Sequence, residues 1–266
     1  MKSRFLLLPV LVTTLFTSCN PPDTRIAINM ECVYQVSTLQ ALVAGYYYGV
    51  STVGDVLAHG NIGLGTFDGA DGEMIVLDGL CYKASYDGTV ELQGRDTPVP
   101  FASTTWFEPD ITANFTTTLD MEALKAELDK IVQKNGANTF YVMRMEGSFP
   151  DMKVRAISKQ EEPYLPLDKV TETCQYVYDY KNLEGTLIAL YCPPYVTGVN
   201  AVGWHLHFLS SDKSKGGHVL GLTMSHGSMA MDRTDFFQME LPNTDKFNSL
   251  NLLGQEDAID KVEKGK

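Results

Sequence analysis

Three histidines within 14 residues place the strongest constraint on how this chain folds, because a strand hairpin would bring their side chains together. Of the five histidines in the chain, His205, His207 and His218 lie in this short span. In a β-strand residues i and i+2 point to the same face, so His205 and His207 present two imidazoles side by side. The polar segment 210–217 ends in glycine and predicts a hairpin loop, which returns His218 beside the pair.

Three neutral imidazoles that converge from adjacent strands favour a metal site. They leave one position of a tetrahedral ion open, as catalytic zinc sites do and closed structural sites do not. A lone histidine is more often a core or surface residue with ordinary hydrogen bonds, but three in one predicted hairpin are typical of ligation. We therefore predict zinc bound by His205, His207 and His218.

The first residues have the pattern of an export signal. Lys2 and Arg4 precede an apolar stretch, 5–16, that is too short to span a bilayer but suits the core of a signal peptide. We expect residues 1–18 to be this signal peptide and the mature protein to leave the cytoplasm.

The end of the signal peptide resembles a bacterial lipoprotein cleavage box. The residues Leu-Phe-Thr-Ser precede Cys19, which would become the lipid-modified residue. Residues 19–31 would then form a tether between a lipid anchor and the folded protein. We expect an exported protein held at a bacterial membrane only by this anchor, in the periplasm or at the cell surface, with secretion as the alternative.

Net charge excludes one class of partner. The formal charge is −12, and the sequence has no basic run with interleaved aromatic residues. Binding of phosphates needs clustered lysine and arginine, so nucleic acid is not expected as a partner.

Cysteine use does not indicate a disulfide scaffold. Cys32, Cys81, Cys174 and Cys192 remain once Cys19 is assigned to lipid. Cys174 and Cys192 flank a turn-like segment and could face each other across a hairpin, and disulfides are allowed outside the cytoplasm. Four cysteines in a chain of 266 residues nevertheless favour free thiols.

Strand patterns outnumber helix patterns along the chain. A meander is predicted over 63–93, because Asp78-Gly79 and Asp87-Gly88 separate apolar runs and are strong hairpin turns. The clearest helix is 121–134, with Asp120 as N-cap and Gly136 as its C-terminal stop. Further strands are expected at 101–107, 139–145, 153–157, 173–178, 185–191 and 235–240, and short helices near 37–42, 55–57 and 256–263.

These elements lack a regular strand-helix-strand alternation and predict an α+β fold of mixed and antiparallel sheets with few helices. Glu161-Glu162-Pro163-Tyr164-Leu165-Pro166 interrupts the pattern. We take it as a domain junction, with an N-terminal α+β domain at 32–162 and a C-terminal zinc-binding β domain with a tail at 163–266.

Two charged residues are candidates for catalytic or substrate-binding roles beside a metal ion. Glu73 stands where a glycine-rich loop enters an apolar strand, and a carboxylate in an apolar site can act as acid, base or orienting acceptor. Arg155 lies in a strand pattern, and its guanidinium suits a substrate carboxylate. The alternatives are that Glu73 is an ordinary solvent-exposed acid at the start of a strand and that Arg155 is a solvent-exposed charge on a strand.

The motifs around these residues resemble those of the acetolactate decarboxylase family. The resemblance extends from about Val33 to the end of the chain. Several motifs in the right order make it more specific than the histidines alone. They are Gly63-Leu64-Gly65-Thr66-Phe67, Asp71-Gly72-Glu73-Met74-Ile75-Val76-Leu77-Asp78-Gly79, Arg155 with Gln160 and Pro163-Tyr164, Gly203-Trp204-His205-Leu206-His207-Phe208 and Gly216-Gly217-His218-Val219.

The resemblance implies an enzyme that uses zinc to decarboxylate 2-acetolactate to acetoin and carbon dioxide. It further implies a two-domain fold of mixed sheets, a homodimer, and three acidic or basic groups around the zinc, namely Glu73, Arg155 and a glutamate near the C-terminus, here Glu263. The segment around Glu263 is polar, but Ala258, Ile259 and Val262 form an apolar stripe that can dock a short helix.

Other interpretations explain fewer of these residues. Carbonic anhydrases combine a His-x-His pair with a third histidine, but that third ligand lies further along the chain. Cupins follow their His-x-His pair closely with a glutamate, which 208–211 does not supply. A surface lipoprotein that binds metal without catalysis accounts for Cys19 and the histidines, but not for Glu73 and Arg155.

Overall fold

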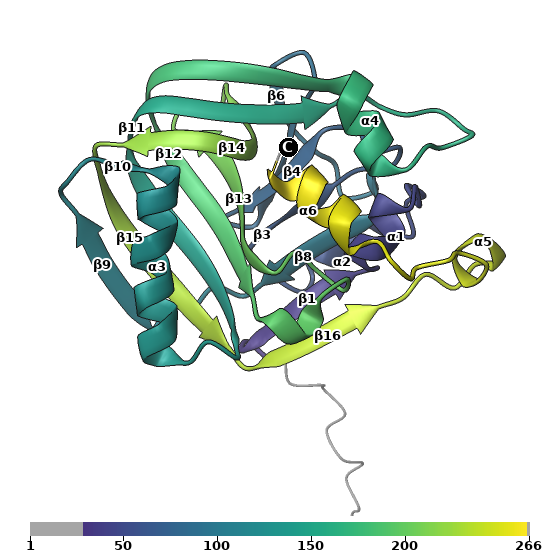
Figure 1. The fold of residues 1–266 in the computed structure, drawn as a ribbon, viewed down its shortest axis with the longest axis horizontal. Coiled ribbons are helices and arrows are strands. Elements are labelled where there is room, and N and C mark those ends of the chain that lie inside the picture. Colours follow the sequence, from purple (N-terminus) through teal and green to yellow (C-terminus); the bar gives the residue numbers. More distant parts are fainter. Residues whose placement is uncertain (1–28, 265–266) are drawn as a thin grey trace, which may run out of the picture.

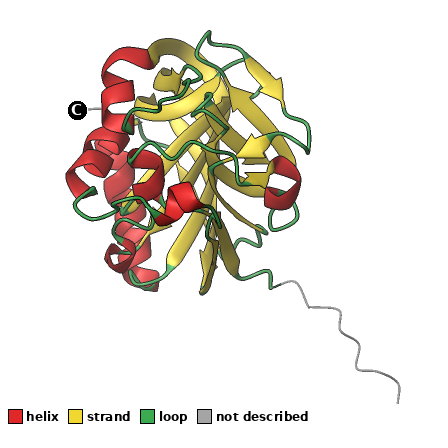
Figure 2. Cartoon of the chain, turned by 90° about the vertical axis from the view of Figure 1, so that its right-hand side faces the viewer, coloured by secondary structure: helices red, strands yellow, loops and turns green. Residues whose placement is uncertain are grey.

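Two seven-stranded sheets form the body of the protein in a computed structural model that describes residues 29–264. The predicted signal peptide, Cys19 and most of the predicted tether lie outside the described residues. Most helices lie on one side of the strands (Figure 2). The predicted α+β class with mixed sheets is confirmed.

The first sheet has the strand order β16-β1-β8-β3-β4-β5-β6. All of its pairings are antiparallel except that of β1 with β16. The predicted meander is confirmed, and Asp78-Gly79 forms its β4–β5 turn with positive φ at both residues, as a type I′ hairpin turn requires. The strands are β1 (Cys32–Val36), β3 (Ile62–Thr66), β4 (Glu73–Leu77), β5 (Leu80–Ala84), β6 (Val90–Leu92), β8 (Phe101–Thr105) and β16 (Phe236–Glu240).

The second sheet has the order β10-β14-β13-β12-β11-β15-β9, and an additional pairing of β14 with β11 closes four of its strands into a ring. The ring therefore runs β11–β12–β13–β14 and back to β11 (Figure 1). The strands are β9 (Ile111–Phe115), β10 (Leu119–Asp120), β11 (Phe140–Ile157), β12 (Gln175–Cys192), β13 (Gly203–Ser210), β14 (Gly216–Met224) and β15 (His226–Thr234); β2 (Ser51–Thr52) and β7 (Pro98–Val99) form a separate pair.

An apolar core joins the two sheets. Ile62, Leu64 and Ile75 from the first sheet share one buried cluster with Ile188 and Leu190 from β12. Burial of such side chains is the main favourable term in folding. The packing brings β4 against the β13–β14 hairpin, which is the basis of the site described below.

The strands β11 and β12 are longer than the sequence patterns predict. The predicted strands 139–145 and 153–157 are parts of β11, and the turn expected near 181–185 is absent because β12 continues through it. Gly147 on β11 lies directly opposite Gly185 on β12. A Cβ on Gly185 would stand 2.5 Å from the ring of Phe208, so glycine permits this close approach of strands.

The cysteines are free. Cys174 and Cys192 do not face each other across a hairpin, because one precedes β12 and the other ends it. The four cysteines of the described residues are all unpaired, as the favoured interpretation predicts. Within residues 29–264, none of the helices has the length and apolar composition needed to cross a bilayer.

The predicted helix over 121–134 is confirmed as α3 (Met121–Asn135). Asp120 caps it by accepting a hydrogen bond from the Ala123 amide, and Gly136 follows it at φ 115°. Thr173 and Cys174, expected at the start of a strand, instead end a helix. The remaining helices are α1 (Leu39–Val43), α2 (Val53–Val56), α4 (Leu167–Cys174), α5 (Asp245–Asn248) and α6 (Glu256–Lys264), with a 3-10 turn at Pro194–Val196.

Candidate functional site

The three histidines meet as the sequence predicts. β13 and β14 form the expected hairpin, with His207 directly opposite His218. The Nε2 atom of His205 lies 3.2 Å from Nε2 of His207 and 3.0 Å from Nδ1 of His218. All three side chains are buried, with exposed fractions of 7%, 1% and 3% in chain order. One nitrogen from each ring therefore points to a common centre.

The other nitrogen of each ring faces an oxygen. His207 donates from Nδ1 to the carbonyl oxygen of Met74 at 2.7 Å. His218 donates from Nε2 to the carbonyl oxygen of Glu263 at 3.2 Å. Nδ1 of His205 lies 3.4 Å from Oε2 of Glu263, longer than a good hydrogen bond.

This pattern tests whether the residues fit a metal ion. A carbonyl oxygen only accepts, so His207 and His218 carry their protons on the outer nitrogens and turn lone pairs toward the centre. Burial lowers the pKa of His205 to about 3 and keeps the pKa values of the other two well below the usual range, so all three rings are neutral. Converging lone pairs of buried neutral imidazoles fit a cation between them.

The backbone of β14 directs His218 into this cluster. Gly217 has φ +146°, and a Cβ there would lie 2.6 Å from the carbonyl oxygen of Arg155. Between β11 and β14 the register shifts, so that Lys153 faces Gly221 while Val154 faces Val219 and Leu220 has no partner. Such bulges redirect side chains beside functional sites. Arg155 and His218 then pair directly.

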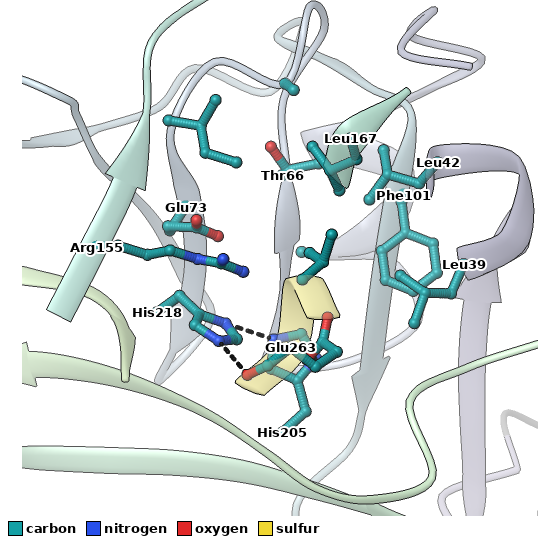
Figure 3. Close-up of a pocket in the computed structure, with 14 residues that line it drawn as sticks. Leu39, Leu42, Thr66, Glu73, Phe101, Arg155, Leu167, His205, His218 and Glu263 are labelled. Carbon is teal, nitrogen blue, oxygen red and sulfur yellow. Dashed lines mark hydrogen bonds and ion pairs between the residues drawn. The ribbon is translucent and has the colours of Figure 1, made fainter. Parts of the chain in front are cut away.

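Arg155 is the most unusual charged residue of the site. Its exposed fraction is 3%, yet Nε and Nη1 have no hydrogen-bond partner among the described residues. A buried guanidinium normally has its donors satisfied. Figure 3 shows it extending beside Glu73 toward the interior of the pocket. The arrangement therefore offers donors to an anion that enters the pocket.

Glu73 begins β4 and thus belongs to the first sheet. Its Oε2 atom is 3.6 Å from Nε2 of His207. The loop before it is fixed by Thr66, whose hydroxyl donates to the carbonyl oxygen of Gly72 at 2.7 Å. Burial raises the pKa of Glu73 to about 7 against the opposing effect of Arg155, and the Glu263 carboxylate raises it further.

Glu263 reaches the site from the C-terminal helix. Ile259 and Val262 bury the apolar face of α6, and Lys261 contacts Glu172 and Asp168 on α4. Burial raises the pKa of Glu263 to about 7, while Arg155 and Lys125 oppose the shift. The structure thus brings Glu263 together with Glu73, Arg155 and the three histidines.

An apolar wall completes the pocket, and sequence patterns did not identify it. The cavity beside the histidines is about 40 Å³. Glu263 also borders a wider hollow of about 460 Å³ beside α3. The wall residues come from separate elements and are ordinary core types, so no local pattern marks them: Leu39, Leu42, Phe101, Ile157, Leu167 and Val262 (Figure 3).

Comparisons with known proteins identify the family of this chain. The sequence profile of the Alpha-acetolactate decarboxylase family matches residues 33–253. The chain is 41% identical over 238 residues to an alpha-acetolactate decarboxylase of Methanosarcina mazei, covering 88% of this chain and 81% of that protein. A relative of the same name from Methylococcus capsulatus is 37% identical over 232 residues, covering 87% of this chain and 88% of that protein.

Solved structures give the same result. The crystal structure of alpha-acetolactate decarboxylase from Bacillus subtilis strain 168 superposes with a TM-score of 0.83 at 31% identity. The superposition covers 88% of this chain and 98% of that one. Sequence profile, relatives and fold agree over most of the chain, so this protein belongs to the alpha-acetolactate decarboxylase family.

Proposed function

We propose that this protein decarboxylates 2-acetolactate to acetoin and carbon dioxide with the help of zinc. The observation that carries the proposal is the buried Arg155 guanidinium, with donors unpaired among the described residues, beside three neutral histidines that converge. Family membership supports the reaction, and the chemistry of the donor set supports the metal.

His205, His207 and His218 would hold the ion through the nitrogens that face one another. When bound, zinc supplies a Lewis acid that stabilises negative charge developing on the ketone and hydroxyl oxygens of the substrate. The three side chains are fixed by two hydrogen-bonded strands and by the Met74 carbonyl, so the site is organised before substrate arrives.

Arg155 would bind the substrate carboxylate. A guanidinium donates two parallel hydrogen bonds to a carboxylate, which fixes the bond to be broken relative to the histidines. Loss of carbon dioxide moves the bonding electrons toward the ketone oxygen. Arg155 is then left beside the carbon that lost the carboxyl group, where it helps to position the incoming proton.

Glu73 and Glu263 would orient the hydroxyl group and organise proton transfer. They approach the cluster from different elements, Glu73 from β4 beside His207 and Glu263 from α6 beside His205. A carboxyl group within reach of the reacting atoms can act as general acid or base. Protonation from one face would produce a single enantiomer of acetoin.

The deciding experiment measures acetoin formed from racemic acetolactate, before and after treatment with a chelator and after zinc is restored. We expect turnover that is lost with the metal and recovered with it. Metal binding without turnover would instead support a non-catalytic surface protein. Full turnover in metal-free protein would leave the decarboxylase assignment standing and remove zinc from it.

Two properties of the whole protein belong to this proposal. We propose that Cys19 carries lipid and anchors an exported enzyme, since its preceding residues have the lipoprotein pattern. Intact mass and detergent partitioning test this, and a product that starts at another residue without lipid would contradict it. We also propose a homodimer, as the family resemblance implies, which sedimentation of the purified protein would check.

A further inference from the structure

A hollow beside α3 adjoins the pocket that holds the histidines. Its volume is about 460 Å³, against about 40 Å³ for the cavity beside the histidines. Side chains of α3 and Leu220 of β14 line the hollow, and Glu263 lines both spaces. The hollow therefore meets the pocket at one residue and has room for an anion as small as acetolactate.

Lys125 on α3 is the only cation that lines this hollow, within the part of the chain that the structure describes. Three carboxylates line it as well, from Glu122 and Asp129 on α3 and from Glu263 on α6. Asp129 accepts a hydrogen bond from the indole of Trp204 at 2.8 Å. Without Lys125, an anion in the hollow would meet a lining that carries negative charge alone.

The charge of Lys125 also acts inside the pocket. Burial lowers the pKa of His205, and the positive charges of Arg155 and Lys125 lower it further. Burial raises the pKa of Glu263, and the same two cations oppose this rise. Positive charge is therefore present at two successive places, with Lys125 in the hollow and Arg155 in the pocket.

The far wall of the pocket offers an anion no such charge. Figure 3 shows Leu42, Phe101 and Leu167 on the side of the pocket opposite Arg155. Apolar side chains cannot replace the water around a carboxylate, so a path along them would cost free energy. The formal charge of −12 on the whole chain repels an anion at longer range. An approach past Lys125 is therefore the most favourable one for a carboxylate.

We propose that Lys125 attracts the carboxylate of the substrate into the hollow beside α3 and directs it toward Arg155. The carboxylate would exchange the ammonium group of Lys125 for the guanidinium of Arg155 as it moves into the pocket. Lys125 is thus a residue for substrate capture and not a catalytic residue. The inference rests on the proposed decarboxylation, and it adds the route of entry and a preference for anionic substrates.

Steady-state kinetics with racemic acetolactate test the inference on variants of a single helix. Lys125→Met removes the charge but keeps an unbranched side chain, so kcat/KM should fall roughly 3–10-fold at low ionic strength, mostly through KM. Lys125→Glu should lower kcat/KM further, and Lys125→Arg should retain it because the charge remains. Lys130→Met is the matched control, since it removes a charge from an exposed ion pair with Glu127 on the same helix and should leave the kinetics unchanged.

Two further measurements separate attraction of charge from a structural defect. The deficit of Lys125→Met should shrink as salt is raised toward about 1 M, where charges are screened within about 3 Å. Acetoin, the neutral product, carries no carboxylate and should inhibit the variant and the unchanged protein equally. Circular dichroism of both proteins checks that α3 is intact.

The outcomes distinguish this inference from the proposed function. Equal kcat/KM in Lys125→Met and Lys130→Met at low salt would overturn the capture role and leave the decarboxylase assignment in place. A loss that salt does not reduce, or one confined to kcat, would overturn it as well. Failure of the unchanged protein to form acetoin would overturn the proposed function, and with it this inference.

Discussion

The β13–β14 hairpin and helix α6 contribute to the same site by different physical means. The hairpin belongs to a closed ring of strands. Backbone pairing fixes His207 and His218 on both sides and His205 on the side of β12. Helix α6 is attached by two buried apolar side chains and a few ion pairs. The geometry of the three histidines is therefore built into the sheets, whereas the position of Glu263 depends on an element held mainly by side chains.

The largest expected effect comes from the hairpin. His207→Ala removes the most buried of the three proposed zinc ligands, and we expect zinc binding and acetoin formation to fall to background. The exposed His226→Ala is the matched control and should retain both. Zinc bound at full strength by the His207 variant, as measured by metal analysis after dialysis, would show that the hairpin is not the metal site.

The second effect tests a residue opposite the hairpin. Arg155→Lys replaces a planar two-pronged donor by a point charge, so kcat should fall roughly 100-fold or more while zinc remains bound. Arg144→Lys, at a half-exposed ion pair with Asp78 and Glu146, is the control. Near-normal turnover in the Arg155 variant would mean that the guanidinium does not bind the substrate.

A smaller effect is expected from the attachment of α6. Lys261→Glu places like charges next to Glu172 and Asp168 and should lower activity roughly 2–5-fold, because exposed ion pairs contribute little. Exchange of the two charges, in Lys261→Glu with Glu172→Lys, should restore it. The defect should also change with salt, since exposed charges are screened. Identical kinetics in all these variants would mean that apolar contacts alone dock the helix.

No effect on activity is expected from a change at Asp232, a buried acid that lies outside the β13–β14 hairpin and α6. Burial raises the pKa of Asp232 to about 7, and one of its oxygens accepts from the Glu108 amide. The folded state thus binds a proton that the unfolded state loses near pH 4, and this contribution to stability disappears as pH rises through about 7.

Asp232→Asn removes this dependence and can keep the bond to Glu108. The variant's advantage in melting temperature should therefore grow between about pH 4 and 7 and then level off. A constant difference across this range, measured by thermal unfolding at matched ionic strength, would contradict the raised pKa. Unchanged decarboxylation would confirm that effects on activity belong to the hairpin and α6.

The contrast between the two regions also explains what the sequence could predict. The hairpin and the meander have period-two patterns and glycine-containing turns, which are local properties. Helix 121–134 has a cap, an apolar face and a stop within one segment. These predictions are confirmed because neighbouring residues decide them.

The missed features depend on residues far apart in the chain. The turn predicted near 181–185 is wrong because Gly185 meets Gly147 across a ribbon, where glycine permits strand contact rather than reversal. Met74 contributes a main-chain carbonyl, for which no side-chain pattern exists. No local sequence pattern around Glu263, apart from a short apolar stripe, indicated a functional role. Only the family resemblance placed this residue near the histidines.

The closed ring of β11, β12, β13 and β14 has a consequence for encounters between molecules. A strand with an unpaired edge can be extended by a strand from another chain, which is a common route to aggregation. Each of the ring strands has neighbours on both sides, so neither histidine strand lies at the border of the sheet. The terminal strands in the two sheet orders are β16, β6, β10 and β9. Intermolecular strand addition would thus start at these borders and leave the histidine strands intact.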